Sequence, residues 1–181
     1  MEVRLRPGRL ATRPAGAVAI GVIESGGPLT GAAREVDRAS GGAVSALLAS
    51  GDFRGRLLET AVLYPRGRKP RRVIVVGLGR RETLDPQRVR MASAVAARRA
   101  RELGAGTLAT VIHGAGAGGL DPARAAQAVA EGAVLGHYRH GAYKRDPGPR
   151  ALRRIELIEH DGERAKTLAP HVTRGAAWAE A

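Results

Sequence analysis

Cysteine is absent from all 181 residues, and this absence excludes three chemistries at once. The chain can build no disulfide framework, no thiolate metal site and no cysteine nucleophile. Aromatic residues make up only 3% of the sequence, so the stacking platforms of single-strand and RNA-binding proteins are largely missing. No apolar run is long enough to cross a bilayer, and no apolar signal core precedes Ala17. These absences predict a soluble cytoplasmic protein without a membrane partner.

Acidic residues are also scarce, at 17 against 30 basic residues, which gives a net charge of +13. A charge of this size suggests an anionic partner such as nucleic acid or a membrane surface. The arginines are spread along the whole chain, however, and alanine and glycine are abundant, as expected from a GC-rich genome. A solvated basic surface is therefore favoured over a dedicated nucleic-acid face.

The composition, 44% hydrophobic and 26% charged, fits one globular domain that spans residues 1–181 and buries a real core. Apolar runs bounded by turn residues predict strands. They lie at residues 3–5, 17–23, 60–64, 73–76, 107–112 and 154–158. Helical periodicity and start or stop signals predict helices between them. These lie at residues 31–40, 43–49, 86–103, 121–140 and 162–181.

Several local signals refine these elements. Thr30 is expected to cap the first helix, and Pro170 to break or kink the last one. In the longest helix we expect a buried stripe of Val89, Ala92, Val95, Ala96 and Leu103.

The order of the elements predicts the fold class. The strands at 60–64 and 73–76 are close enough in sequence to pair as a hairpin, which puts one antiparallel step into the sheet. In the second half of the chain strands alternate with helices. We therefore expect an α/β domain with a mixed, mostly parallel sheet covered by helices on both faces. The sequence shows no internal repeat and no second domain.

Three long segments, taken together in their order and spacing, resemble a known family. They are AVAIGVIESGGPLTGAAREVDRASGGAVSALLASGDFRGRLLETAVLYP at 17–65, RRVIVVGLGRRETLDPQRVRMASAVAARRARELG at 71–104 and AQAVAEGAVLGHYRHGAYK at 126–144. The succession is similar to the N-terminal domain of the leucyl aminopeptidases, the cytosolic metallopeptidase family numbered seventeen. The resemblance implies a three-layer α/β/α macro-like domain. It also implies a non-catalytic domain with a structural and regulatory role, because the peptidase chemistry belongs to a separate C-terminal domain.

The resemblance also predicts cofactors and partners. Two divalent metals, zinc or manganese, are expected only in the catalytic domain, whose motif Asn-Thr-Asp-Ala-Glu-Gly-Arg does not occur here. No catalytic, cofactor or metal residue is therefore assigned to this chain. The partner would be its own catalytic domain, toward which residues 174–181 would begin the connecting helix. The parent enzyme is expected to be a hexamer, and this domain alone a monomer or weak oligomer.

Two glycine-rich segments raise a ligand-binding alternative. Residues 114–119 match G-x-G-x-x-G after a strand, but the following helix starts only at Asp121 and no acidic residue ends a following strand at the required distance. A tight connection is favoured there over a dinucleotide site. Because true macro domains bind ADP-ribose through loops at strand ends, residues 77–80 and 113–119 are expected to be neighbours. A stand-alone module that binds ADP-ribose or a nucleotide is thus the first alternative function.

Titratable residues suggest two weaker constellations. His137 and His140 lie one helical turn apart and could share a metal with Glu131 or Asp146. A solvated helix end with partly charged imidazoles is favoured instead. No serine has a nucleophile-elbow context. Paired carboxylates fare no better, since Glu156 and Glu159 lie on or beside the strand at 154–158 and are expected to face opposite ways.

A basic cluster surrounds the turn of the predicted hairpin, and it suggests the second alternative function, a basic DNA-binding domain. It consists of Arg66, Arg68, Lys69, Arg71 and Arg72. Five cations within one turn could contact several phosphates, and some bacterial leucyl aminopeptidases also bind DNA. A solvated turn without a partner is favoured over this reading.

Overall fold

The computed structural model describes residues 1–24, 27–66, 69–116, 118–138 and 152–181. Its strands are β1 (Glu2–Pro7), β2 (Ala17–Ile23), β3 (Thr60–Leu63), β4 (Val73–Gly79), β5 (Thr107–Thr110) and β6 (Arg154–Glu159). Its helices are α1 (Gly31–Ala39), α2 (Ala43–Ser50), α3 (Pro86–Glu102), α4 (Pro122–His137) and α5 (Gly162–Glu180). Two short 3-10 turns, η1 (Leu10–Thr12) and η2 (Arg81–Thr83), complete the elements. No described helix combines the length and apolarity that a bilayer crossing needs.

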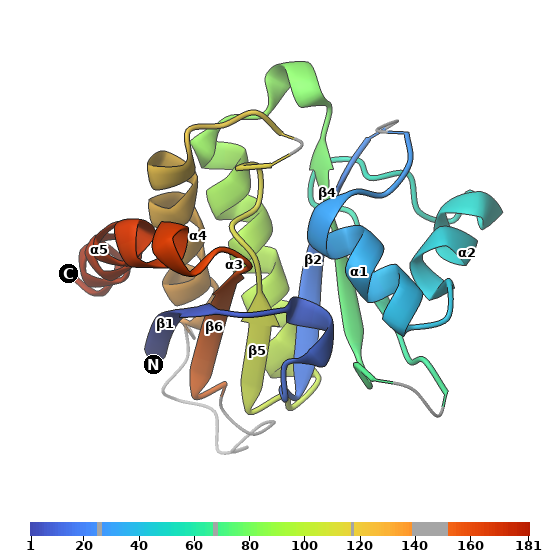
Figure 1. Ribbon diagram of the computed structural model, residues 1–181, viewed down its shortest axis with the longest axis horizontal. Coiled ribbons are helices and arrows are strands. Elements are labelled where there is room, and N and C mark those ends of the chain that lie inside the picture. The colour runs from blue at the N-terminus through green and yellow to red at the C-terminus, as the bar shows by residue number, and fades with distance from the viewer. Residues whose placement is uncertain (25–26, 67–68, 117, 139–151) are drawn as a thin grey trace.

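The six strands form one sheet in the order β1-β6-β5-β2-β4-β3 (Figure 1). Every neighbouring pair is parallel except β3 and β4, which are antiparallel. The short connection between β3 and β4 leaves no room for a crossover helix, so the two strands must run in opposite directions. The predicted hairpin and the mixed, mostly parallel sheet are both confirmed.

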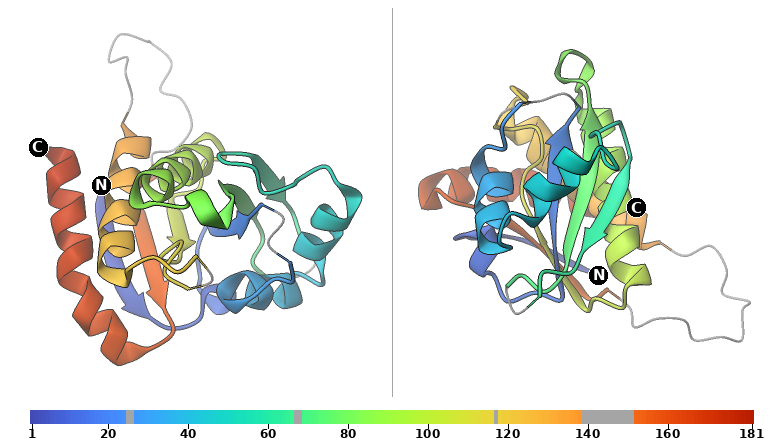
Figure 2. Two further views of the ribbon diagram at one scale, coloured as in Figure 1. Left: turned by 90° about the horizontal axis from the view of Figure 1, so that it is seen from above. Right: turned by 90° about the vertical axis from the view of Figure 1, so that its right-hand side faces the viewer.

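Helices cover both faces of this sheet, as expected for a three-layer α/β/α domain (Figure 2). Successive side chains of a strand point to opposite faces, and β2 shows the consequence. Ala17 and Ala19 pack in the core shared with α3, α4 and α5. Val18 and Ile20 pack in a second core with η1, α1 and α2. Because β2 is apolar on both sides, it lies at the centre of the sheet between the two cores.

Small residues allow α3 and α4 to pack at very short range. A Cβ added to Gly132 in α4 would lie only 2.0 Å from the carbonyl oxygen of Arg90 in α3. The buried face of α3 therefore consists mostly of alanines. Val89 and the predicted alanines are buried, whereas Val95 and Leu103 are only half-buried. Leu103 nevertheless packs against the core, so the predicted stripe was wrong only at Val95, which is not among the residues packed against either core.

Several element boundaries differ from the expectations. The helix α5 continues through Pro170, so the expected break is wrong. Pro170 is exposed, while Leu168 and Val172 on either side are buried, so packing holds the helix across the missing amide. The helix α4 ends at His137 rather than near His140, which lies outside the described residues.

The strand β4 extends past its predicted end because of Gly77. The amide of Gly77 donates to the carbonyl of Glu59 at 2.8 Å, and its carbonyl accepts from the amide of Leu58 at 2.9 Å. A Cβ at Gly77 would lie 1.9 Å from the carbonyl oxygen of Arg56. Glycine is thus required where the segment before β3 crosses the strand, and Gly77 belongs to the sheet rather than to a ligand-binding turn.

Candidate functional site

A pocket of about 330 Å³ lies at the carboxyl ends of the parallel strands. Its lining comes from the ends of β2, β4, β5 and β6, the loops after β2 and β5, the first turn of α1 and the start of α5. A second pocket of about 280 Å³ adjoins it and shares residues such as Ala32, Val111 and His160. The two form one groove across this edge of the sheet.

The groove lies where the chain leaves the sheet in two directions. The segment after β2 leads to α1 on one face, and the segment after β5 leads to α4 on the other. The strands β2 and β5 are neighbours, so their two loops diverge and leave a crevice between them. Ligands of open α/β sheets bind in such crevices outside the carboxyl ends of the strands. The fold therefore makes this groove the candidate binding site.

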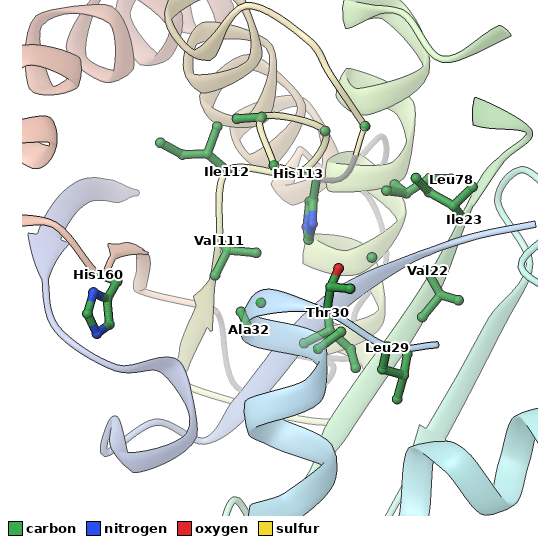
Figure 3. A pocket seen from close by; sticks show the side chains of 18 of the residues that line it. Val22, Ile23, Leu29, Thr30, Ala32, Leu78, Val111, Ile112, His113 and His160 are labelled. Atoms are coloured by element: carbon green, nitrogen blue, oxygen red, sulfur yellow. The ribbon is translucent and has the colours of Figure 1, made fainter. Parts of the chain in front are cut away.

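His113 projects into the pocket from the loop that follows β5 (Figure 3). Its side chain is 3% exposed, and its Nε2 atom lies 3.0 Å from the hydroxyl oxygen of Thr110. That hydroxyl donates its only proton to the carbonyl of Ala19 at 3.1 Å. Nε2 must therefore carry the hydrogen and donate to Thr110, which leaves Nδ1 as an acceptor.

Burial keeps this imidazole neutral. It lowers the pKa of His113 from the ordinary 6.5 to about 4, because the charged ring would lose its hydration. The ring lies directly over Gly21 of β2, where an added Cβ would come within 2.9 Å of Nδ1. The missing side chain at Gly21 thus makes room for the imidazole. At neutral pH the pocket contains a fixed hydrogen-bond acceptor at His113 Nδ1.

The first turn of α1 supplies donors on the opposite wall. Thr30 occupies the N-cap position, but its side chain makes no capping hydrogen bond, which corrects the predicted cap. The amides of Gly31, Ala32 and Ala33 consequently have no partner among the described residues. Figure 3 shows the Thr30 hydroxyl and the His113 imidazole pointing toward each other across the pocket. The Thr30 hydroxyl and the His113 imidazole therefore face the same space, beside the unpartnered start of α1.

Charged residues at the margin give the pocket a positive bias. Arg81 lines it as an exposed residue that follows β4. Glu159 at the end of β6 also lines it, but its carboxylate lies 3.5 Å from the guanidinium of Arg164. Arg164 neutralises this one acidic group of the lining, so an anion meets a net positive margin.

The two predicted glycine segments do meet here. Leu78 comes from the first, and His113, Gly114 and Gly116 come from the second. The structure does not favour a dinucleotide-binding motif at these glycines, because α4 begins only at Pro122, after the last glycine, with Asp121 as its cap. Ala117, inside the G-x-G-x-x-G match, lies outside the described residues. Gly114, Ala115, Gly116 and Gly118 line the groove, and the helix α4 begins only at Pro122.

The histidine pair does not form a metal site as far as the structure describes it. His140 and Asp146 lie outside the described residues, and the buried carboxylate of Glu131 is held by Arg90 and Gln127. Across the described ranges, no three side chains of metal-ligating type come together.

The ring of His137, expected to be solvated and partly charged, is half-buried. Its Nδ1 is buried and has no hydrogen-bond partner among the described residues. Burial, the Met1 amino group and Arg101 all lower the pKa of this ring.

The carboxylates of β6 face opposite ways, as predicted. Glu156 is 6% exposed and accepts a hydrogen bond of 2.6 Å from Arg13. This bond to the guanidinium lowers the pKa of Glu156, although burial opposes the shift. Glu159 lies instead in the groove with Arg164. Glu156 is thus part of a structural ion pair and is remote from the candidate site.

The basic hairpin cluster lies at the other edge of the sheet, beside the start of β4 (Figure 1). Arg66, Lys69 and Arg71 are exposed, and Arg68 lies outside the described residues. Arg72 is half-buried and donates to the carbonyl of Leu103 at 3.1 Å, which ties the hairpin to the end of α3. One of the five cations therefore has a structural role, and DNA binding by the others stays a prediction.

Sequence reasoning placed His113 at the start of a candidate ligand-binding loop without giving its side chain a role, and it did not single out the free start of α1. One signal was available for His113, since it directly follows the apolar run at 107–112 and so had to lie at the carboxyl end of a strand. No sequence signal showed that Thr30 would leave its helix uncapped. That outcome depends on the direction in which the loop enters α1.

Comparison with known proteins finds the relatives of this chain among cytosol aminopeptidases. A family model described as the N-terminal domain of the cytosol aminopeptidase family matches residues 19–147. A probable cytosol aminopeptidase of Roseiflexus castenholzii is 39% identical over 113 residues, which are 62% of this chain and 23% of that protein. One of Halorhodospira halophila is 33% identical over 180 residues, which are 98% of this chain and 36% of that protein. The chain spans about a third or less of these relatives.

Solved structures show the same fold. A tomato leucine aminopeptidase mutant superposes with a TM-score of 0.76 at 21% identity, over 99% of this chain and 35% of that one. A Trypanosoma brucei macrodomain in complex with ADP-ribose superposes with a TM-score of 0.72 at 17% identity, over 94% of this chain and 69% of that one.

Proposed function

Because the chain belongs to the cytosol aminopeptidase family, as its N-terminal domain, we propose that it is a non-catalytic domain with a structural and regulatory role beside a catalytic domain of the same protein. The family match over residues 19–147 carries this proposal. The whole enzyme would release N-terminal amino acids from peptides in the cytoplasm and form a hexamer. The isolated domain would be a monomer or a weak oligomer.

The metal chemistry of such an enzyme would belong to the catalytic domain. Within the described part of this chain the donor side chains do not fit a pair of divalent ions, because no three of them converge. The buried carboxylates of Glu131 and Glu156 are already held by arginines. No step of peptide hydrolysis is therefore assigned to residues of this chain.

The purified chain is expected to release no p-nitroaniline from Leu-p-nitroanilide with zinc or manganese present. The physical reason is that the described residues bring together no group of side chains that could hold the metal ions of a metallopeptidase. The measurement is the absorbance of released p-nitroaniline against a no-enzyme blank. A full-length relative assayed in parallel is the positive control. Metal-dependent turnover by the purified chain would contradict the proposal.

A second function, binding of ADP-ribose or another nucleotide, is supported by one observation. The pocket of about 330 Å³ lies at the switch point of the sheet, where α/β folds bind ligands. The ADP-ribose complex of the Trypanosoma brucei macrodomain shares the fold. A domain of this kind could sense a nucleotide and influence its catalytic partner, which would give the regulatory role a mechanism.

Under this second function, ADP-ribose is expected to raise the melting temperature of the chain. A ligand that binds only the folded state at a hundred times its Kd stabilises it by about 2.7 kcal/mol. For a domain of this size that corresponds to a rise of roughly 5–10 °C. Differential scanning fluorimetry gives the shift and calorimetry the Kd. Adenosine, which lacks phosphate, is the matched control and should shift the melting temperature less. An unchanged melting temperature at millimolar ADP-ribose would exclude this second function.

A further inference from the structure

Two sets of fixed polar groups face each other inside the switch-point pocket. We propose that this pocket holds its ligand at two points: the free amides at the start of α1 bind an anionic group, and Nδ1 of His113 accepts a hydrogen bond from a neighbouring hydroxyl of the same ligand. The ligand class is a phosphorylated sugar or a sugar-bearing nucleotide. This inference rests on the second proposed function and adds the groups that would recognise the ligand.

The start of α1 has two features that favour the binding of an anion. Its first amides lack partners among the described residues and carry the positive end of the helix dipole. The other long helices differ, because Asp85, Asp121 and Asp161 accept hydrogen bonds from the first amides of α3, α4 and α5. At α1 that acceptor is missing, and Thr30 turns its hydroxyl into the pocket (Figure 3). A phosphate oxygen would supply the missing acceptor.

His113 is the independent observation that a ligand hydroxyl belongs in the pocket. His113 is only 3% exposed, and its Nε2 is hydrogen-bonded to the hydroxyl oxygen of Thr110 at 3.0 Å. Nδ1 makes no hydrogen bond within the described structure, and the imidazole lies across the pocket from the Thr30 hydroxyl (Figure 3). The Thr110 hydroxyl donates its hydrogen to the carbonyl of Ala19. The ring therefore cannot move its own hydrogen from Nε2 to Nδ1 without losing the hydrogen bond between Nε2 and Thr110.

The two sets of groups also fix the orientation of the ligand. A phosphate oxygen placed against Nδ1 would meet a lone pair, whereas the same oxygen placed against the start of α1 would meet N–H donors. The reverse holds for a hydroxyl, which can donate to Nδ1. Donors on one wall and an acceptor on the other therefore admit the anionic group on the α1 side alone. A ligand that carries an anionic group and a hydroxyl side by side therefore fits the pocket better than a ligand that carries only one of the two.

Two substitutions at His113 separate recognition from folding. His113→Gln keeps an N–H that can donate to Thr110 but removes the acceptor at the Nδ1 position. His113→Asn places its amide oxygen where Nδ1 lies and gives up the bond to Thr110. If the acceptor recognises a hydroxyl, the Gln variant should weaken ADP-ribose binding roughly tenfold, while the Asn variant should retain most of it. Isothermal titration calorimetry on the full chain measures both.

Thr30→Asp tests the anion-binding part of the proposal, because it should keep or raise the stability of the fold while it weakens ligand binding. Aspartate at the N-cap would bond the free amides and keep or raise the melting temperature, since it is a better cap than threonine. The same carboxylate would occupy the anion site, so ADP-ribose binding should fall by roughly tenfold or more. Thr173→Asp, on the exposed face of α5, adds the same charge far from the pocket and should leave the Kd unchanged.

Inorganic phosphate distinguishes this inference from the second proposed function. In ¹H–¹⁵N spectra of the labelled chain, phosphate should shift the amides of Gly31, Ala32 and Ala33. Long-range spectra of the His113 ring should show hydrogen on Nε2, and ADP-ribose should shift Nδ1.

If ADP-ribose binds with equal affinity to wild type, His113→Gln and Thr30→Asp, the inference is wrong although the second function stands. If ADP-ribose does not bind but phosphate shifts the three amides, the second function fails and the anion site is supported. If neither ligand perturbs the pocket, both fail.

Discussion

Gly77→Ala is expected to destabilise the domain by about 3 kcal/mol or more, because the added Cβ would overlap backbone atoms of a neighbouring segment. The added atom would lie 1.9 Å from the carbonyl oxygen of Arg56 and 2.7 Å from the carbonyl carbon of Gly55. Both are backbone atoms, so no side chain can rotate away to relieve the overlap. To make room, the segment before β3 would have to give up its hydrogen bonds with Gly77, including the one of 2.8 Å to the carbonyl of Glu59.

Urea denaturation followed by circular dichroism gives the free energy of unfolding of this variant. Gly162→Ala is the matched control, since an added Cβ there meets no atom within 4 Å and the residue begins α5. It should stabilise the chain slightly or leave it unchanged, within about 1 kcal/mol. Equal midpoints for the two variants would show that the close approach at Gly77 does not constrain the native state.

The free energy of unfolding should fall by about 3 kcal/mol between pH 7 and pH 4 through His113 alone. The folded-state pKa of His113 is about 4, against an ordinary value of 6.5. Above pH 6.5 the ring is neutral in both states and contributes no pH dependence. Between pH 6.5 and 4 the His113 imidazole is protonated in the unfolded chain but stays neutral in the folded chain, so acid favours unfolding. The loss is complete once the pH falls below 4.

His113→Gln isolates this contribution, because glutamine does not titrate and keeps a donor for Thr110. The quantity to measure is the difference in unfolding free energy between wild type and variant at pH 7, 6, 5 and 4.5. Taking the difference cancels the remaining groups, among them His137, whose pKa is also lowered. The lowered pKa of Glu156 acts in a more acidic range, below the ordinary 4.5 of its carboxyl group. A difference that does not change with pH would show that His113 titrates normally in the folded protein.

Most of the sheet could be predicted from the sequence, because its strands are short apolar runs with clear ends. Ala17–Ile23 forms β2 as expected, and the hairpin of β3 and β4 follows from the few residues between them. Asp85 and Asp121 cap α3 and α4 because each precedes a proline that starts a helix. Errors occurred where a neighbouring element decides the outcome. Pro170 stays within α5, and Gly77 stays within β4, because packing and hydrogen bonds from other segments hold them there.

The sequence by itself determined the fold class and most of the elements, since apolar periodicity and local turn chemistry suffice for these, and it indicated the family through the resemblance of three long segments. The tertiary structure alone decided the candidate site. His113 lies far along the chain from Gly21 and Thr30, and the three meet because parallel strands end at one edge of the sheet. The tautomer of His113 depends on a hydroxyl of β5 and a carbonyl of β2. Such contacts join residues that no local pattern relates, so only the folded chain defines them.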